Sequence, residues 1–389
     1  MKRTSISILL LLIVISGFRM LDDVPFQIPA NWPKPQYNFA KNPLNSDKIE
    51  LGRHLFYDPI LSRDSTISCS SCHSQFTAFT HVDHDLSHGI EDRIGFRNAP
   101  AVMNLAWQKS LMWDGAINHL DMQSLAPIEN PDEMDEHFDR VIKKLNSNTK
   151  YKTLFKKAFG DERVTGEKTL KAIAQFMLTI VSANSLYDKM LRKEISFNTQ
   201  QENGYRLFKS HCASCHTEPL FTNGEFENNG LRIDTSLMDF GRMRVTQNAK
   251  DSLKFKVPTL RNIEFSYPYM HDGRFKKLSE VINHYVSGIQ QGPTLSKNLQ
   301  KKIELTSNEK VDLTAFLLTL TDREFLFNQK YSYPKYTFLL KFALHTQLIK
   351  LHTNEKSDTC FNCFNTKHFI KCTKSCNYFL ATKYHWNYG

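Results

Sequence analysis

The feature that most constrains this chain is a five-residue pattern that occurs twice. Residues 69–73 (CSSCH) and 212–216 (CASCH) both follow the spacing C-x-x-C-H, the attachment sequence of a c-type haem. On a turn of helix, two thiols three residues apart can each form a thioether with one vinyl group of a porphyrin, and the following histidine points at the iron. A single C-x-x-C pair can instead serve zinc or disulfide chemistry, and that alternative stays open for each pair. Two copies closed by histidine favour two covalent haems, attached through Cys69, Cys72, His73, Cys212, Cys215 and His216.

The size and charge of the chain narrow the class of protein. Its 389 residues are 41% hydrophobic, which is enough for two packed domains. The formal net charge of +10 lies mostly at the two ends, because the first 19 residues contain three basic residues and no acid, and eight lysines follow Tyr333. Residues 20–332 are close to neutral. We therefore expect no nucleic-acid-binding surface.

The N-terminus resembles an export signal. Lys2 and Arg3 precede an apolar run from Ile6 to Ile15, which is short for a membrane span. Because no small-x-small cleavage site stands out, residues 1–19 suit either a cleaved signal peptide or a retained membrane anchor. Thioether attachment of haem needs reduced thiols delivered outside the cytoplasm, so a periplasmic location fits the two motifs.

The sequence pattern predicts an all-α fold with two cytochrome c-like haem-binding lobes, long loops and little strand, since period-two alternation is nearly absent. We expect an extended, Pro-rich arm over 20–44, an N-terminal haem domain over 45–195 and a C-terminal haem domain over 196–332. The longest helix is expected over 167–191, where apolar residues follow a helical period and would pack a core.

Residues 333–389 form a separate, Cys- and Lys-rich segment. Its four cysteines have the spacing C-x2-C-x8-C-x3-C, which suits a zinc site with a nearby histidine or a pair of disulfides. The segment has no clean helical or strand period, so a disordered or weakly packed appendage is the favoured interpretation. The residues concerned are Cys360, Cys363, His368, Cys372 and Cys376.

From about Asn45 to Leu326, the chain resembles the bacterial di-haem cytochrome c peroxidases and the related MauG-type enzymes of methylamine utilisation. The resemblance rests on the two haem motifs and on stretches that include LGR (51–53) with Asp58, RNAP (97–100), WDG (113–115), Pro127 with Glu133, SANS (182–185), PTLRN (258–262) and YPYMHDG (267–273). It implies a peroxidase that reduces hydrogen peroxide with electrons from a small cytochrome or a cupredoxin. Members of the family are often homodimers.

The resemblance also assigns roles by position. His73 and His216 would be the proximal iron ligands of the peroxidatic and the electron-transfer haem. Glu133 falls on the distal acid, Trp113 on a tryptophan between the haems, and Gln123 on a residue near the peroxide site. Composition alone would make Glu133 an exposed helix-terminal charge and Trp113 a core aromatic, so both roles depend on the resemblance.

Two further ligand sets follow from the same match. Asn98, with the backbone carbonyls of Ser266 and Pro268, falls on a calcium site that links the lobes, and oxygen ligands suit such a hard cation. Tyr285 falls on the distal ligand of the second haem, where the best-known peroxidases have methionine and the MauG-type enzymes tyrosine. A phenolate should lower the potential of that haem. Met270 is the alternative ligand.

The distal ligand of the first haem is less sharply placed. His88 is the nearest match to the histidine that caps this iron in resting peroxidases. Its spacing to Arg97 is longer than expected, so His81 and His84 remain alternatives.

These patterns predict an exported di-haem c-type peroxidase. A MauG-like oxidase that withdraws electrons from a protein side chain is the alternative, and Tyr285 favours it. A non-catalytic electron-transfer cytochrome is the third hypothesis. A carboxylate at the position of Glu133 separates the enzymes from the carrier, because peroxide cleavage needs a group that moves a proton between the two oxygens.

Overall fold

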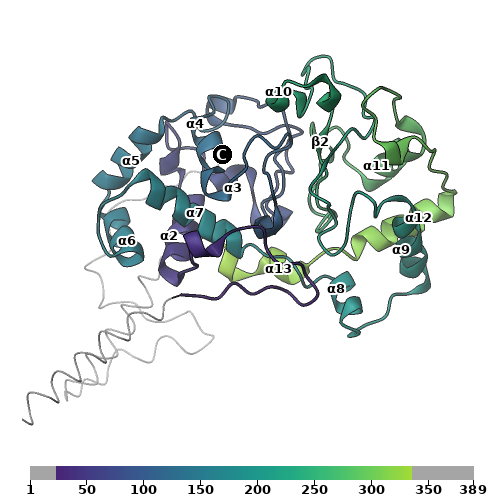
Figure 1. The fold of residues 1–389 in the computed structure, drawn as a ribbon. Coiled ribbons are helices and arrows are strands. Elements are labelled where there is room, and N and C mark those ends of the chain that lie inside the picture. The colour runs from purple at the N-terminus through teal and green to yellow at the C-terminus, as the bar shows by residue number, and fades with distance from the viewer. Residues whose placement is uncertain (1–22, 335–389) are drawn as a thin grey trace, which may run out of the picture. The chain divides into compact units, whose positions relative to one another are not determined.

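The computed structural model describes residues 23–334, which form two helical lobes around separate hydrophobic cores (Figure 1). The first core gathers buried side chains between Leu44 and Ile180 together with three from the end of the described chain, and the second gathers those between Tyr187 and Leu320. The described part of the chain is rich in helix and contains one antiparallel sheet of two short strands. The predicted signal or anchor over 1–19 and the cysteine-rich segment beyond Pro334 lie outside the described residues.

The first lobe contains α2 (Ser46–Tyr57), α3 (Cys69–Cys72), α4 (Leu125–Glu129), α5 (Phe138–Ser147), α6 (Thr149–Phe159) and α7 (Gly166–Thr179). The second contains α8 (Leu186–Leu191), α9 (Thr199–His211), β1 (Phe226–Glu227), α10 (Met243–Thr246), β2 (Phe255–Lys256), α11 (Leu278–Asn283), the π-helical turn η9 (His284–Gly288) and α12 (Ser307–Leu318). Short 3₁₀ turns occupy Phe39–Lys41, Pro59–Leu61, Gln75–Thr77, Ile90–Asp92, Leu105–Trp107, Leu120–Met122, Ala249–Asp251, Lys297–Leu299 and Gln329–Tyr331.

The last helix, α13 (Arg323–Phe327), returns to the first lobe. Its Phe325 and Leu326 are buried in the first core, although the preceding helix α12 belongs to the second. The ring of Phe325 lies 5.7 Å from that of Phe79, which follows the first haem motif. The end of the described chain therefore fastens the two lobes together.

Both lobes are built on a pair of helices that touch backbone to backbone. A Cβ atom on Gly52 of α2 would lie 1.9 Å from the carbonyl oxygen of Ala172 in α7. A Cβ atom on Gly204 of α9 would likewise lie 1.9 Å from the carbonyl oxygen of Asp312 in α12. Only glycine leaves room for such an approach. The same glycine-centred crossing thus precedes each haem motif.

Phenylalanines flank each crossing one turn further along. Phe56 packs on Phe176 in the first lobe, with ring centroids 5.2 Å apart, and Phe208 packs on Phe316 in the second, at 5.0 Å. All four rings are fully buried. The two lobes therefore repeat one packing arrangement, which the sequence shows only as a glycine followed four residues later by phenylalanine.

The expectation of one continuous helix over 167–191 is wrong. α7 ends at Thr179, residues 180–185 are not helical, and α8 begins at Leu186. The carboxylate of Asp322 accepts hydrogen bonds from two backbone N–H groups and a serine hydroxyl of the intervening stretch, at 2.9 to 3.2 Å. This carboxylate lies roughly 140 residues further along the chain, so the apolar period of the local sequence could not reveal the break.

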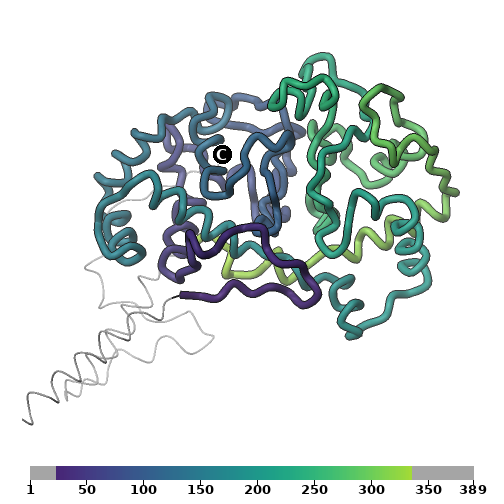
Figure 2. Tube along the Cα trace, in the orientation of Figure 1, coloured from purple at the N-terminus to yellow at the C-terminus, as the bar shows by residue number. Residues whose placement is uncertain are grey.

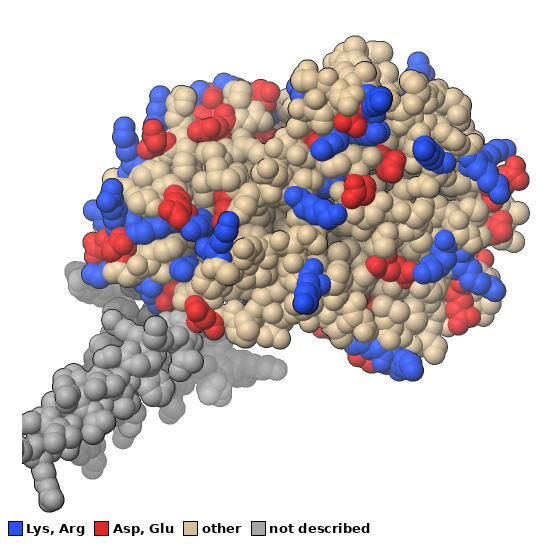
Figure 3. Space-filling view, in the orientation of Figure 1, with Lys and Arg blue, Asp and Glu red and all other residues tan. Residues whose placement is uncertain are grey.

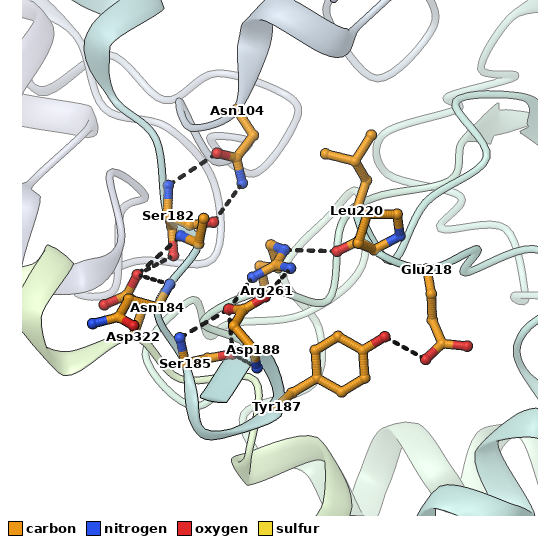
Figure 4. A network of polar contacts seen from close by, with 12 residues as sticks. Asn104, Ser182, Asn184, Ser185, Tyr187, Asp188, Glu218, Leu220, Arg261 and Asp322 are labelled. Atoms are coloured by element: carbon orange, nitrogen blue, oxygen red, sulfur yellow. Dashed lines mark hydrogen bonds and ion pairs between the residues drawn. The ribbon is translucent and has the colours of Figure 1, made fainter. Parts of the chain in front are cut away.

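A polar network surrounds this break where the two lobes join (Figure 4). The guanidinium of Arg261 is fully buried and forms two hydrogen bonds with Asp188, both at 2.8 Å. Burial opposes ionisation of Asp188, but its hydrogen bonds with Arg261 prevail and lower its pKa. On the other side of the break, the backbone N–H of Asp322 donates to Asn262 at 2.8 Å. Paired charges and satisfied amides fix the junction.

Residues 23–44 form an arm that runs along the molecule and doubles back into α2 (Figure 2). Its Pro33 carbonyl accepts a hydrogen bond from the indole of Trp107 at 2.8 Å, in the first lobe. Its Trp32 ring lies 4.6 Å from the guanidinium of Arg261, in the second. The arm contacts both lobes across their junction.

Basic and acidic side chains are interspersed on the face shown in Figure 3, with uncharged surface between them. This distribution agrees with the near-neutral charge of residues 20–332. No helix within residues 23–334 has the length and apolar character needed to cross a bilayer.

Candidate haem centres and active site

The first C-x-x-C-H motif sits on the single helical turn α3. Ser68 and Ser71 form a capping box at the start of this turn, and His73 follows its end. The Nδ1 atom of His73 lies 3.0 Å from the carbonyl oxygen of Phe79. An N–H on Nδ1 donates to this carbonyl, which leaves Nε2 as the atom that can bind a metal.

The second motif repeats this arrangement after α9. Nδ1 of His216 lies 3.1 Å from the carbonyl oxygen of Phe221 and 3.1 Å from that of Pro258. Phe79 and Phe221 are both buried and both have a positive φ, of 58° and 54°. Each lobe therefore uses a buried phenylalanine in the left-handed conformation to turn a carbonyl toward the histidine of its motif.

The protonation of these groups suits haem attachment. Burial lowers the pKa of His73 to about 4 and also lowers that of His216, so both imidazoles are neutral. Burial raises the pKa of Cys69 and of Cys212 to about 12, which keeps both as thiols. Residues 23–334 contain no group of three or more His, Cys, Asp or Glu side chains that could hold a metal ion, whereas a structural zinc site needs four such ligands. The described residues therefore do not favour the zinc alternative.

A cavity of about 260 Å³ opens beside the second motif. Its walls include all three attachment residues of that motif, and its other side chains are mostly apolar, as a porphyrin face requires. The apolar part of the wall includes Leu260, Ile263, Ile282, Leu313 and Leu317. Thiols, an oriented imidazole and an apolar slot in one cavity fit a covalently bound haem.

Both candidates for the distal ligand of the second haem line this cavity. The side-chain amide of Asn229 lies 3.5 Å from the sulfur of Met270 and 3.5 Å from the hydroxyl of Tyr285, so the two side chains approach the same point. Tyr285 lies on the π-helical turn η9, a local geometry that is frequent at functional sites. Burial raises the pKa of the Tyr285 phenol to about 12, so a strong Lewis acid is needed to hold it as phenolate.

Trp113 lies where the two lobes meet. Its indole N–H donates to the carbonyl of Asn98 at 2.8 Å, and its own carbonyl accepts from the backbone N–H of Lys256 in the second lobe, at 2.7 Å. Trp113 also lines the cavity of the second motif. Its placement is compatible with the role that the resemblance implies.

The three residues of the expected calcium site also line this cavity. Asn98 is buried, and its backbone N–H donates to the carbonyl of His271 at 2.7 Å, while its side-chain amide donates to Asp85 at 3.0 Å. Ser266 and Pro268 lie on the neighbouring loop of the second lobe. The structure thus places all three residues on the lining of one cavity, and the calcium site stays a prediction.

Glu133 lies beside the first motif. It is partly buried, and this burial raises its pKa, although a hydrogen bond from Asn130 at 2.9 Å opposes the shift. Burial and the negative charge of Glu133 together raise the pKa of Cys72 to about 11, which places the carboxylate within electrostatic reach of the haem-binding thiols. The backbone carbonyl of Glu133 accepts from Ile90 at 2.8 Å and so ties this turn to the preceding loop.

The histidines that follow the first motif form a stack. The rings of His84 and His88 lie 3.9 Å apart, and Nε2 of His81 lies 3.2 Å from Nδ1 of His84. The carbonyl of His88 accepts a hydrogen bond from the thiol of Cys72 at 3.3 Å. All three distal candidates therefore lie together near the first motif, and the structure does not single out one of them.

Within residues 23–334, no hydrogen bond joins Gln123 to Glu133. Its amide N–H₂ lies 3.1 Å from the sulfur of Met112, and its side-chain oxygen is buried without a hydrogen-bond partner within the described chain. Its amide therefore has a free acceptor.

Sequence reasoning missed one ion-pair cluster near these residues. Arg97 forms hydrogen bonds with both carboxylate oxygens of Asp239, at 2.6 and 2.9 Å, and with Asp114 at 2.6 Å. Arg97 belongs to the first lobe and Asp239 to the second, and both are largely buried. Arg97 and Asp114 belong to the matched stretches, but no signal in the sequence points to Asp239.

Two helical lobes that each carry a thiol pair and an oriented histidine define a di-haem c-type cytochrome. The sequence profile described as "Di-haem cytochrome c peroxidase" matches residues 46–196, and the profile described as "Cytochrome c" matches residues 201–321. The chain belongs to the di-haem cytochrome c peroxidase and MauG family, as the following relatives show, and it binds two covalent c-type haems.

The similarity extends over most of the chain. The chain is 35% identical over 307 residues to the methylamine utilization protein MauG of Methylorubrum extorquens, an alignment that covers 76% of this chain and 83% of that protein. It is 37% identical over 287 residues to the cytochrome c551 peroxidase of Nitrosomonas europaea, with 72% and 82% covered. A crystal structure of a MauG-like protein associated with microbial copper homeostasis superposes with a TM-score of 0.71 and 32% identity, covering 80% of this chain and 99% of that one.

Proposed function

We propose that this protein is an exported di-haem peroxidase that reduces hydrogen peroxide to two molecules of water, with two protons and two electrons supplied by a small cytochrome or a cupredoxin. The family supports this proposal, because its profile is that of the di-haem cytochrome c peroxidases and the relatives of this chain include the cytochrome c551 peroxidase of Nitrosomonas europaea. The bound haems supply the iron that polarises the peroxide and hold the electrons that cleave its O–O bond.

The observation that carries the proposal is the partly buried carboxylate beside the first motif. Glu133 accepts a proton from one peroxide oxygen and delivers it to the other, so that water can leave. A carboxylate with a raised pKa suits this exchange, because its proton affinity is closer to that of the peroxide oxygens than the affinity of an ordinary carboxylate is. Asn130 fixes the direction of the carboxylate through its hydrogen bond to Oε1.

The variant Glu133→Gln tests this role. It keeps the size of the side chain and removes its proton exchange, so we expect peroxide turnover to fall about 10²–10⁴-fold. Both haem spectra should stay unchanged. A matched control is Glu129→Gln, which removes a carboxylate from the same acidic run. Unchanged turnover in Glu133→Gln would contradict the assignment.

The two lobes would divide the work of the enzyme between two haem domains. We propose that residues 45–195 form the peroxidatic domain with His73 as proximal ligand, and residues 196–332 the electron-transfer domain with His216. Trp113, at the junction, conducts electrons between them. The cavity wall that it shares with the second motif supports this path.

We further propose a calcium ion on the oxygens of Asn98, Ser266 and Pro268, which suit a hard cation. His88 is the proposed distal ligand of the first haem in the resting state, and Gln123 a pocket residue whose free amide oxygen can accept a hydrogen bond. We also propose a periplasmic location and a homodimer. Cell fractionation and light scattering test these two proposals.

A MauG-like oxidase that acts on a protein side chain is the second candidate function. Tyr285 supports it, because a phenolate ligand would stabilise the oxidised form of the second haem and disfavour simple electron entry. Tyr285→Phe should then change the spectrum and raise the potential of the second haem. An unchanged spectrum would exclude tyrosine as the ligand and leave Met270, and the peroxidase would become the better-supported function.

A further inference from the structure

A partly buried lysine lines the cavity of the second motif. Lys256 lines this cavity together with Cys215, His216 and Trp113, and it is the one lysine or arginine among the lining residues. Its ammonium donates to the carbonyl of Ser110 at 3.0 Å. Within residues 23–334, no carboxylate forms an ion pair with it.

The sheet and Trp113 hold Lys256 in this position. β2 pairs with β1 so that Lys256 lies opposite Phe226, and the backbone N–H of Lys256 donates to the carbonyl of Trp113 at 2.7 Å. The backbone of Lys256 is therefore held on both sides, which fixes the point from which its side chain extends. The two-stranded sheet therefore delivers one positive charge to the cavity.

The surrounding protein compensates this charge only in part. Burial lowers the pKa of Lys256 to about 8, although the charge of Asp114 attracts the ammonium. The carboxylate of Asp114 is already bound to Arg97 at 2.6 Å. Glu227, the acidic residue that lines the cavity, pairs with Phe255 across the sheet and makes no ion pair with Lys256.

An ammonium has three donors, and Lys256 uses one of them on a described residue. A partly buried charge without an ion-pair partner, facing an apolar cavity, favours an anion beside it. A c-type haem carries two propionate carboxylates in addition to its thioether bonds.

We propose that Lys256 binds a propionate carboxylate of the haem attached to Cys212 and Cys215, and that its positive charge raises the reduction potential of this haem. The proposal rests on the proposed function only in requiring a haem at the second motif. A nearby cation opposes the loss of an electron from the iron, so Lys256 offsets part of the effect of a tyrosinate ligand. Lys256 is a positioning residue, and it does not touch peroxide.

The test is a spectroelectrochemical titration of the full-length holoprotein, in which the two haems are resolved. In Lys256→Met, the equilibrium constant for reduction of the second haem should fall about tenfold, which is 59 mV for one electron. The first haem should not change. Lys256→Arg keeps the charge and should restore most of the potential.

Lys109→Met is the matched control. Lys109 precedes Ser110, its side chain is 64% exposed, and it pairs with Glu225 at 3.7 Å, so water and salt screen its charge. We expect the potentials of this variant to equal those of the unaltered protein. A second-haem potential in Lys256→Met that equals that of Lys109→Met would overturn the proposal, because a purely structural lysine would change stability and not potential.

Two measurements on the unaltered protein keep the proposal testable even where a variant does not fold. A crystal structure of the holoprotein should place the Lys256 ammonium within about 4 Å of a propionate oxygen, and a larger separation refutes the pairing. The number of haems bound per chain distinguishes failure of the proposed function from failure of the Lys256 proposal. Fewer than two haems per chain would overturn the proposed function and this proposal together, whereas two haems with unchanged potentials would overturn this proposal alone.

Discussion

Replacing Gly204 by alanine tests whether backbone contact between α9 and α12 holds the second lobe together. The added Cβ would lie 1.9 Å from the carbonyl oxygen of Asp312 and 2.8 Å from Cβ of Phe316, whereas Cβ atoms essentially never come within 3.0 Å of another atom. The atoms in its way are backbone and a buried Cβ, which cannot rotate aside. The two helices must therefore separate by roughly 1 Å.

The cost follows from the contacts that this separation weakens. A gap of about 0.5–1 Å forfeits a quarter to a half of the dispersion attraction across it, and a large buried side chain makes about 40–60 contacts of about 0.1–0.2 kcal/mol each. Losing a quarter of these contacts at Phe208 and Phe316 corresponds to roughly 2–6 kcal/mol. The better helix propensity of alanine recovers about 1 kcal/mol. We expect a net loss of about 3 kcal/mol in the free energy of unfolding.

The assay is guanidinium unfolding of the holoprotein, followed by circular dichroism and by the absorption of each haem. Gly292→Ala is the control, because no atom lies within 4 Å of the added Cβ and the backbone there is not in the left-handed region. It should change stability by less than about 1 kcal/mol. Gly52→Ala should act in the same way on the first lobe. If Gly204→Ala unfolds at the same denaturant concentration as Gly292→Ala, the close approach of the helices does not require glycine, and the reasoning fails.

Three further predictions concern the active site and the junction. Because burial raises the pKa of Glu133 and the ionised form must accept the first proton, kcat/KM should fall as pH drops through this raised pKa, and Glu133→Gln should lose that limb of the pH profile. Burial opposes ionisation of Asp239, but Arg97 prevails and lowers its pKa. The stability that this ion pair contributes is complete above the pKa of Asp239 in the unfolded chain, about 3.9, and is lost as pH falls through its lower pKa in the folded protein. Arg97→Met should therefore remove this part of the dependence of Tm on acid pH. Trp113→Phe should lower peroxide turnover while both haem spectra persist, which stopped-flow and static spectra would check.

The features that could be predicted from the sequence are those that neighbouring residues determine. The two C-x-x-C-H motifs specify covalent attachment within five residues, and the comparisons confirm two c-type haems. The start of helix α2 is likewise determined locally, because the Asn45 side chain accepts hydrogen bonds from the backbone N–H groups of Asp47 and Lys48 at 3.0 and 3.2 Å. Family membership was likewise predicted from short matched stretches.

The features that could not be predicted depend on residues far apart in the chain. The apolar period over 167–191 continues through the break after α7, because the group that stabilises the break is the distant carboxylate of Asp322. Arg97 and Asp239 are separated by 142 positions. The glycine crossings did leave a local signal, since a glycine and a phenylalanine four residues apart precede each motif, but a pattern of two residues is too common to be specific.

The two lobes share one way of presenting a histidine and differ in what faces it. Both turn the carbonyl of a buried phenylalanine toward Nδ1, at 3.0 and 3.1 Å, so the proximal side is nearly constant. The charged and ligating groups around the two motifs, in contrast, differ between the lobes. A partly buried carboxylate, Glu133, lies near the first motif, whereas Tyr285, Met270 and Lys256 line the cavity of the second. In the proposed function, the proton-accepting Glu133 serves bond cleavage at the first haem. The proposed ligand Tyr285, with Lys256 in the same cavity, serves storage of an oxidising equivalent at the second. A repeated fold can therefore support two different tasks, because the residues that separate these tasks lie outside the helices that the lobes have in common.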